Sequence, residues 1–181
     1  MKQTIRIVLI CFGLASAAWA QQVQASASYL YQGSNQVPGA TNWFGANGGR
    51  ADVSFGNWHR LGAVAEIAGA STSNLTTFTY MAGPRRSIAL GRLEKRKVSA
   101  FAQILMGGVH ASDGLFPSGT TIKSSADAFA LSAGGGLEVG ISHRVSLRMI
   151  QADYLYTRLP NLFDDYESNF RLGAGIAFRL P

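Results

Sequence analysis

The sequence has almost no cysteine, little charge and few histidines. Cys11 is the single cysteine, and charged residues make up 14% of the 181 residues, against roughly 25% in ordinary soluble domains. Since Cys11 falls within an expected export signal, the mature chain lacks cysteine, which excludes disulfides, zinc–thiolate centres and thiol catalysis. The three histidines are isolated and show no metal-ligand spacing, so we expect no metal and no other cofactor.

A long apolar run is also lacking, because no segment has the ~20 consecutive apolar residues that a membrane helix needs. The N-terminus instead carries Lys2 and Arg6, a short apolar run over residues 7–15, and Ala18-Trp19-Ala20, which predicts cleavage after Ala20. We therefore expect a signal peptide over residues 1–20 and one domain over residues 21–181. Export, low charge and the lack of a membrane helix favour a secreted β-protein or a membrane β-barrel.

The excess of positive charge does not indicate a nucleic-acid partner. The formal net charge is +6, but the basic residues are scattered, apart from a run at residues 92–97. That run either meets anionic phosphate head groups or is simply solvated, and we favour solvation.

Strict alternation marks the last stretch of the chain, residues 169–180. Every second residue is apolar, and those between are polar, charged or small, with Arg171 and Arg179 among them. Because successive strand side chains point to opposite faces, the pattern indicates a strand with one side toward lipid and one toward a narrow wet lumen. The apolar set is Phe170, Leu172, Ala174, Ile176, Phe178 and Leu180.

Similar alternation predicts seven further strands, so that both ends of an up-and-down barrel lie on the same side. The phase slips near Met149 and Ile150, which indicates a β-bulge, unless one of the two inward groups is misassigned. Pro84 is expected to end the fourth strand. The eight strands are predicted over residues 23–31, 50–55, 61–70, 75–83, 98–110, 128–141, 145–157 and 169–180.

The predicted connections are mostly short on one side and long on the other. On one side, short turns are expected at residues 56–60 and 142–144. On the other side, long polar loops are expected at residues 34–47, 111–127 and 158–168, together with a brief turn at 71–74. Short periplasmic turns and longer outer loops are the pattern of membrane barrels. The basic connector expected at residues 84–97 does not fit that pattern, since it is long on the supposedly short side.

Several short motifs along the mature chain resemble one family, the small eight-stranded outer-membrane β-barrels. This is the class of the OmpA transmembrane domain and OmpX-like proteins, the bacterial "outer membrane protein β-barrel domain" group. The motifs, which accompany the signal peptide, are Met81-Ala82-Gly83-Pro84-Arg85, Phe101-Ala102-Gln103 followed by Gly107-Gly108, Gly134-Gly135-Gly136-Leu137, Val145-Ser146-Leu147-Arg148 with Asp153-Tyr154, and Gly175-Ile176-Ala177-Phe178.

The resemblance implies an all-β fold: an eight-stranded antiparallel up-and-down transmembrane β-barrel in the outer membrane of a Gram-negative-type bacterium. Outer-membrane lipids are then partners. Phe178 resembles the near-terminal aromatic by which the barrel-assembly machinery recognises such strands, although Pro181 follows where the family usually ends on the aromatic. The resemblance says little about biochemical activity.

The predicted inward faces carry both signs of charge in near balance. An eight-stranded barrel has an interior just wide enough for side chains, and buried charges must pair or cost several kcal/mol each. We therefore expect a lumen filled by arginine–carboxylate pairs, without a wide pore; the alternative is a narrow gated ion path that favours anions. The expected members are Arg50, Asp52, Glu66, Arg85, Glu138, Arg148, Asp153, Arg171 and Arg179.

An enzymatic alternative rests on His110 and Ser112, which lie two apart and so share a strand face. Eight-stranded lipid A deacylases, to which this pattern is similar, use a histidine–serine pair and an acid on the barrel wall, and histidine activates serine as a general base. Asp113 stands where that family has asparagine, and the sequence places no acid beside His110. We therefore predict a protein that is not an enzyme.

Aromatic residues gather near the predicted strand ends, as in interfacial belts of membrane proteins. A soluble secreted barrel with a small apolar ligand, as in lipocalins, is the other architecture that fits. Any extracellular partner is expected at the loops 34–47 and 111–127. The belt residues are Tyr29, Tyr31, Trp43, Phe44, Tyr80, Tyr154, Tyr156, Phe163 and Tyr166.

Overall fold

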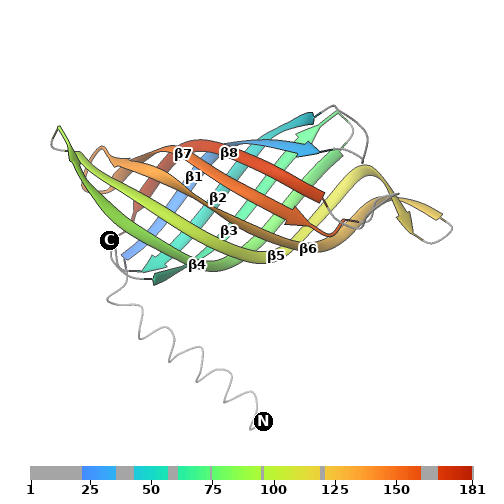
Figure 1. Cartoon of the computed structure of the whole chain (residues 1–181), viewed down its shortest axis with the longest axis horizontal. Helices are drawn as coiled ribbons and strands as arrows, with labels where there is room; N and C mark the ends of the chain where they lie inside the picture. Colours follow the sequence, from blue (N-terminus) through green and yellow to red (C-terminus); the bar gives the residue numbers. More distant parts are fainter. Residues whose placement is uncertain are drawn as a thin grey trace, which may run out of the picture.

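The computed structural model describes residues 22–35, 43–56, 61–73, 75–94, 96–118, 121–159 and 167–180. Within them, eight strands form one closed antiparallel barrel in which each strand pairs with the next and the last pairs with the first (Figure 1). The predicted signal peptide lies outside the described residues. The strands are β1 (Gln22–Asn35), β2 (Trp43–Gly56), β3 (Leu61–Thr72), β4 (Leu75–Leu93), β5 (Arg96–Ser118), β6 (Thr121–Gly140), β7 (Val145–Thr157) and β8 (Glu167–Arg179).

The barrel closes through β8, the strand with the strictest alternation. Its register with β1 runs from Gln24 opposite Arg179 to Ser34 opposite Asn169, which confirms the predicted pairing. β1 begins and β8 ends at the same end of the barrel, and the β4–β5 and β6–β7 hairpins lie there too (Figure 1). The β5–β6 hairpin projects from the opposite end. We call these two ends the terminal end and the loop end.

The prediction that Pro84 ends the fourth strand, with a basic connector over residues 84–97, is wrong. β4 continues to Leu93, and β5 begins at Arg96. On the β5 side, the partners on either side of the proline stay in one register, Ala82 opposite Met106 and Arg85 opposite Gln103. Proline has no N–H, so one ladder hydrogen bond is lost at Pro84. The pairs on either side of Pro84 keep the same register, and the strand therefore continues through it.

The loop predicted over residues 111–127 is also largely strand. β5 extends to Ser118 and β6 begins at Thr121, with a register shift between Ser112 and Phe116. Asp113 has a φ of 64° at this irregularity. The turn-forming composition therefore marks a bulged hairpin. The loops predicted over residues 34–47 and 158–168 are too long, since residues 34–35, 43–47 and 167–168 belong to β1, β2 and β8. Residues 36–42 and 160–166 lie outside the described residues.

The bulge predicted in β7 is present. The β7–β8 register shifts between Arg148 and Gln151, and both Met149 and Ile150 are exposed on the outer face. Because Met149 and Ile150 both point outward, the inward positions change from even-numbered to odd-numbered residues at the bulge. Arg148 and Gln151 therefore both face the lumen.

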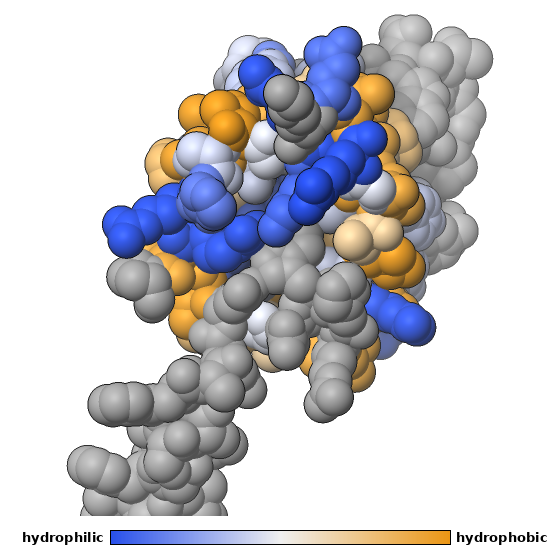
Figure 2. Space-filling view, turned by 90° about the vertical axis from the view of Figure 1, so that its left-hand side faces the viewer, coloured by the Kyte–Doolittle hydropathy of each residue, from blue (hydrophilic) through white to orange (hydrophobic). Residues whose placement is uncertain are grey.

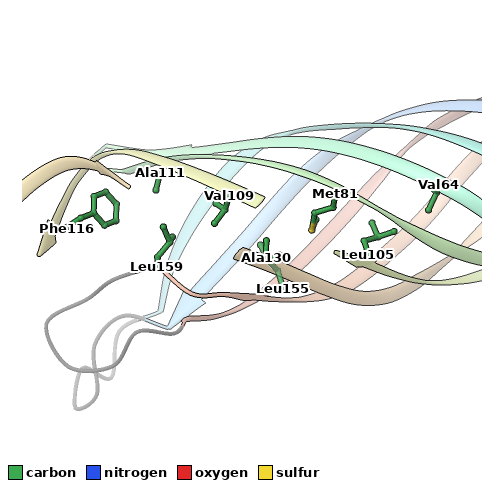
Figure 3. Packing of buried hydrophobic residues seen from close by; sticks show 9 residues of the cluster. All are labelled: Val64, Met81, Leu105, Val109, Ala111, Phe116, Ala130, Leu155 and Leu159. Carbon is green, nitrogen blue, oxygen red and sulfur yellow. The ribbon is translucent and has the colours of Figure 1, made fainter. Parts of the chain in front are cut away.

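The lumen has a polar part and an apolar part. The apolar part is a cluster of buried side chains inside the barrel, running from Val64 to Phe116 toward the loop end (Figure 3). The sequence prediction placed a charge network throughout the lumen and did not include this cluster. Its members are Val64, Met81, Leu105, Val109, Ala111, Phe116, Ala130, Leu155 and Leu159.

The outer face is apolar along the strands. Ile67 on β3 is 51% exposed, and Ile104 and Met106 on β5 are 55% and 59% exposed, all at outward positions. Tyr80, also outward, lies over Gly108 of the neighbouring strand, where a Cβ atom would come within 2.4 Å of its hydroxyl. An aromatic side chain that packs over a glycine of the neighbouring strand helps to fix the register of the two strands. Among the described residues, no helix combines the length and hydropathy needed to cross a membrane.

Candidate functional site: the charge network of the lumen

Eight of the nine charged residues predicted for the lumen are brought together inside it. They come from six strands, because each occupies an inward position in the two-residue alternation. All are 5% exposed or less, and the four guanidinium groups match the four carboxylates. They are Arg50 and Asp52 on β2, Glu66 on β3, Arg85 on β4, Glu138 on β6, Arg148 and Asp153 on β7, and Arg171 on β8.

Arg148 is the centre of one group of contacts, on the side of the terminal end. It is fully buried and lies 2.6 Å from Asp52 Oδ2 and 2.8 Å from Glu138 Oε1. Arg85 approaches the other oxygen of Asp52 at 2.9 Å. Ser26 donates to Asp52, and Gln24 donates to Glu138 at 2.9 Å. Each carboxylate thus has an arginine and a neutral donor.

Phe101 contacts both guanidinium groups of that cluster. The Arg85 and Arg148 carbon atoms Cζ are 4.6 and 4.8 Å from its ring centroid, within the range of cation–π attraction. Gly136, directly opposite in the β5–β6 ladder, leaves room for the ring, since a Cβ there would be 2.8 Å from it. Sequence analysis missed this inward aromatic, although its spacing of two from Gln103 was the available signal.

Arg50 and Arg171 form a second group around Glu66 and Asp153. Arg171 donates to Glu66 Oε1 at 3.0 Å, and Arg50 lies 3.6 Å from Glu66 Oε2 and 2.7 Å from Asp153 Oδ2. The Arg50 contacts are ion pairs without hydrogen-bond geometry. Ser132 accepts a further bond from Arg171 at 3.1 Å.

Two glutamines join the groups. Gln103 accepts from Arg85 at 2.6 and 2.9 Å and donates to Glu66 and Asp153 at 3.4 Å. Gln151 accepts from Arg148 at 2.9 Å and donates to Asp153 at 3.2 Å. The two charge groups and their glutamines therefore form one connected network.

Arg179, the ninth predicted member, lies at the rim of the terminal end. Its Nη1 donates to the carbonyl oxygen of His143 at 3.5 Å. It is the last residue of β8, so its inward side chain reaches the mouth of the barrel and not the centre of the network. The described part of the chain has no group of three or more His, Cys, Asp or Glu placed to hold a metal ion.

The His110 and Ser112 pair lies on the outer face. His110 Nδ1 is 2.8 Å from Asp127 Oδ1, its cross-strand partner on β6. The prediction that no acid stands beside His110 is therefore wrong. The Ser112 hydroxyl, however, donates to Asp113 at 3.4 Å. A histidine–acid pair is therefore present, whereas the acceptor of the serine hydroxyl is Asp113.

No family model and no curated protein matches this sequence. Among solved structures, Neisserial surface protein A (NspA) superposes with a TM-score of 0.54, at 12% identity, over 88% of this chain and 97% of that one. This protein has the fold of the small outer-membrane β-barrels. Ail, the attachment invasion locus protein of Yersinia pestis, matches with a TM-score of 0.45 at 18% identity, over 87% of this chain and 99% of that one. The fold class expected from the sequence is confirmed.

Proposed function

We propose that this protein is an integral β-barrel of a Gram-negative-type outer membrane, with a structural or interaction role. The observation that carries the proposal is the inversion of polarity: charges gather inside, and large apolar side chains such as Ile67, Ile104 and Met106 are exposed outside. A soluble barrel would expose polar side chains on that face, whereas lipid favours this arrangement.

Membrane fractionation tests this proposal. We expect the protein to sediment with the outer membrane and to need detergent for extraction, because its exterior is apolar along the strands. The unboiled barrel is also expected to migrate differently from the boiled chain in gel electrophoresis. Recovery in the soluble periplasmic fraction without detergent would contradict the proposal and favour the lipocalin-like carrier.

The packed lumen supports a barrel without a wide pore. Toward the terminal end the buried ion pairs fill it, and toward the loop end it contains apolar side chains such as Leu105, Val109 and Leu155, each at most 1% exposed. An ion path needs polar groups in place of the water it loses. The buried polar groups of this part, such as Gln32, Ser34 and Asn169, are bonded to one another, and the apolar side chains beside them narrow the lumen. The same filling leaves little room for the interior ligand of a lipocalin-like carrier.

A second candidate function, hydrolysis of an acyl ester, is favoured by one observation, the contact of His110 with Asp127. Against it, the hydroxyl of Ser112 is bonded to Asp113. We expect the purified barrel to release no fatty acid from lipid A, measured by mass spectrometry of the lipid. Release that disappears in both Ser112→Ala and His110→Asn, but persists in Ser125→Ala on the neighbouring strand, would establish the enzyme.

Partners of two further kinds belong to this proposal. The projecting β5–β6 hairpin at the loop end is the place for an extracellular partner, since variable function is carried on loops of a rigid scaffold. The barrel-assembly machinery would bind β8 through its apolar outward side chains, Phe178 included, which is 47% exposed.

A further inference from the structure

The β4–β5 hairpin continues past its neighbouring strands at the terminal end of the barrel (Figure 1). In the described part of the chain, the ladder of β4 with β3 ends at Arg86, and the ladder of β5 with β6 begins at Val98. β4 and β5 remain paired with each other beyond these two residues. We call this outer part, residues 87–94 and 96–97, the terminal hairpin.

The register of β4 with β5 fixes which way the side chains of the terminal hairpin point. Ser99 faces the lumen, because it lies opposite Glu138 of the charge network. Its partner Ala89 therefore also faces the lumen, and Val98 faces outward. Beyond Ala89 the register shifts, so that Gly91 lies opposite Val98 on the outer face. The shift is a β-bulge, and the φ of 138° at Gly91 is one that residues with a side chain rarely adopt.

The bulge places three large apolar side chains on the outer face of the terminal hairpin. Ile88 and Leu90 lie on either side of the inward Ala89. Leu93 lies two residues beyond the outward Gly91, whereas unbroken alternation would have turned it toward the lumen. Ile88, Leu90 and Leu93 are 52%, 59% and 66% exposed. The register shift therefore keeps all three on one face.

The opposite face of the terminal hairpin carries cations. Arg92 lies opposite Lys97, and Lys97 precedes the outward Val98, so both cations are on the side of the barrel mouth. The terminal hairpin is thus a ribbon with one apolar and one charged face. Figure 2 views this end of the molecule, where strongly hydrophilic residues form a band with hydrophobic residues on both sides.

The apolar face of the terminal hairpin continues the apolar outer face of the barrel. Along β4, the outward row runs from Tyr80, a predicted belt residue, to Leu90, and this distance matches the roughly 9–11 residues of a transmembrane strand. Ile88 and Leu90 are exposed to an extent similar to that of Ile104 on the barrel wall. Arg86 interrupts the row, but an arginine near a membrane boundary extends its charged group to the head groups while its stem contacts apolar surface.

We propose that the outer face of the terminal hairpin contacts lipid at the boundary between the acyl chains and the head groups of the periplasmic leaflet, and so anchors this end of the barrel. The inference rests on the proposed membrane location, which puts the terminal end on the periplasmic side. Water would leave Ile88, Leu90 and Leu93 exposed, whereas this boundary covers them. The face with Arg92 and Lys97 then remains in water.

Spin labelling tests the proposal, because Cys11 lies in the predicted signal peptide and a thiol introduced into the mature barrel is therefore unique. Leu90→Cys, Lys97→Cys and Ile104→Cys would each carry a nitroxide in vesicles of phosphatidylethanolamine and phosphatidylglycerol, after gel mobility has shown that the barrel is folded. Electron paramagnetic resonance measures collisions of the label with oxygen, which concentrates in lipid, and with a nickel chelate, which stays in water. We expect oxygen to be preferred at Leu90→Cys, as at Ile104→Cys on the barrel wall, and nickel at Lys97→Cys on the other face of the hairpin.

Two results at Leu90→Cys would overturn the proposal. Nickel access equal to that at Lys97→Cys would show that the apolar face lies in water. Shielding from both reagents would show that a periplasmic protein or a second copy of this chain covers it. In either case, a preference for oxygen at Ile104→Cys would leave the membrane location intact, whereas nickel access there would overturn that location and the anchor with it.

Discussion

Replacing Arg148 with methionine is expected to lower the free energy of unfolding by about 3–5 kcal/mol, the usual cost of breaking a buried pair by removing one partner. Arg148 is fully buried and contacts Asp52, Glu138 and Gln151 at 2.6–3.0 Å. Methionine fills much of the side-chain volume, but it leaves carboxylate charge uncompensated in a lumen without bulk water. Urea unfolding of the refolded barrel in phospholipid vesicles would measure the loss.

Arg144→Met is the matched control for that experiment, because Arg144 is an exposed cation in the turn four residues away. Its effect is expected to stay within about 0.5 kcal/mol, as for surface substitutions in general. In a double-mutant cycle, Arg148→Met and Asp52→Asn should be less than additive by roughly 0.5–3 kcal/mol, because they share one contact. A neutral Arg148→Met would contradict a stabilising role for the network.

Replacing Ile67 with arginine is expected to cost about 2–4 kcal/mol when the barrel is embedded in a bilayer, the penalty for a cation on the lipid face near the midplane. Ile67 lies in the middle of β3 (Leu61–Thr72) and is 51% exposed on the outer face. In a soluble barrel the same position would face water, and an arginine there would change stability little. The substitution therefore measures what surrounds the outer face.

Ser71→Arg provides the control on the same face of the same strand. Ser71 is exposed and lies one residue from the end of β3, so the penalty there should fall to roughly 0–1 kcal/mol, as near a membrane interface. Unfolding of both variants would be followed in vesicles. Equal small effects at the two positions would contradict a membrane-spanning exterior and support the soluble alternative.

The network explains why an apolar exterior and a charged interior are compatible in one chain. Asp52 joins Arg85 on β4 to Arg148 on β7 through its two oxygens, and Gln103 joins this group to Glu66. Buried ion pairs stabilise a fold only when their remaining hydrogen-bonding groups are also satisfied. The neutral partners Ser26, Gln103 and Gln151 meet that condition for the group around Arg148.

Local sequence determined the faces of the strands. Alternation with a period of two is a property of each strand by itself, so the inward position of Arg148, the outward position of Ile67 and the bulge at Met149 follow from neighbouring residues alone. The closing strand, residues 169–180, was predictable for the same reason. Its pairing with β1 follows once an even number of strands must close.

Where the strands end was less predictable, because turn-forming residues mark a hairpin without fixing how far its strands extend. Pro84 continues β4 because the flanking register is kept, and the polar residues after Ser112 pair across a bulge with β6. Both outcomes depend on the neighbouring strand.

Tertiary structure alone decided which charges meet. Asp52 and Arg148 are 96 residues apart in sequence and touch across the lumen, and His110 meets Asp127 through the β5–β6 register. The same closure brings apolar inward residues such as Leu105 and Leu155 into one cluster and leaves Arg179 at the rim. Alternation fixes the face of a side chain, but its height and partner depend on the stagger with which eight strands close. That stagger is a property of the whole barrel and is not encoded in any single stretch of sequence.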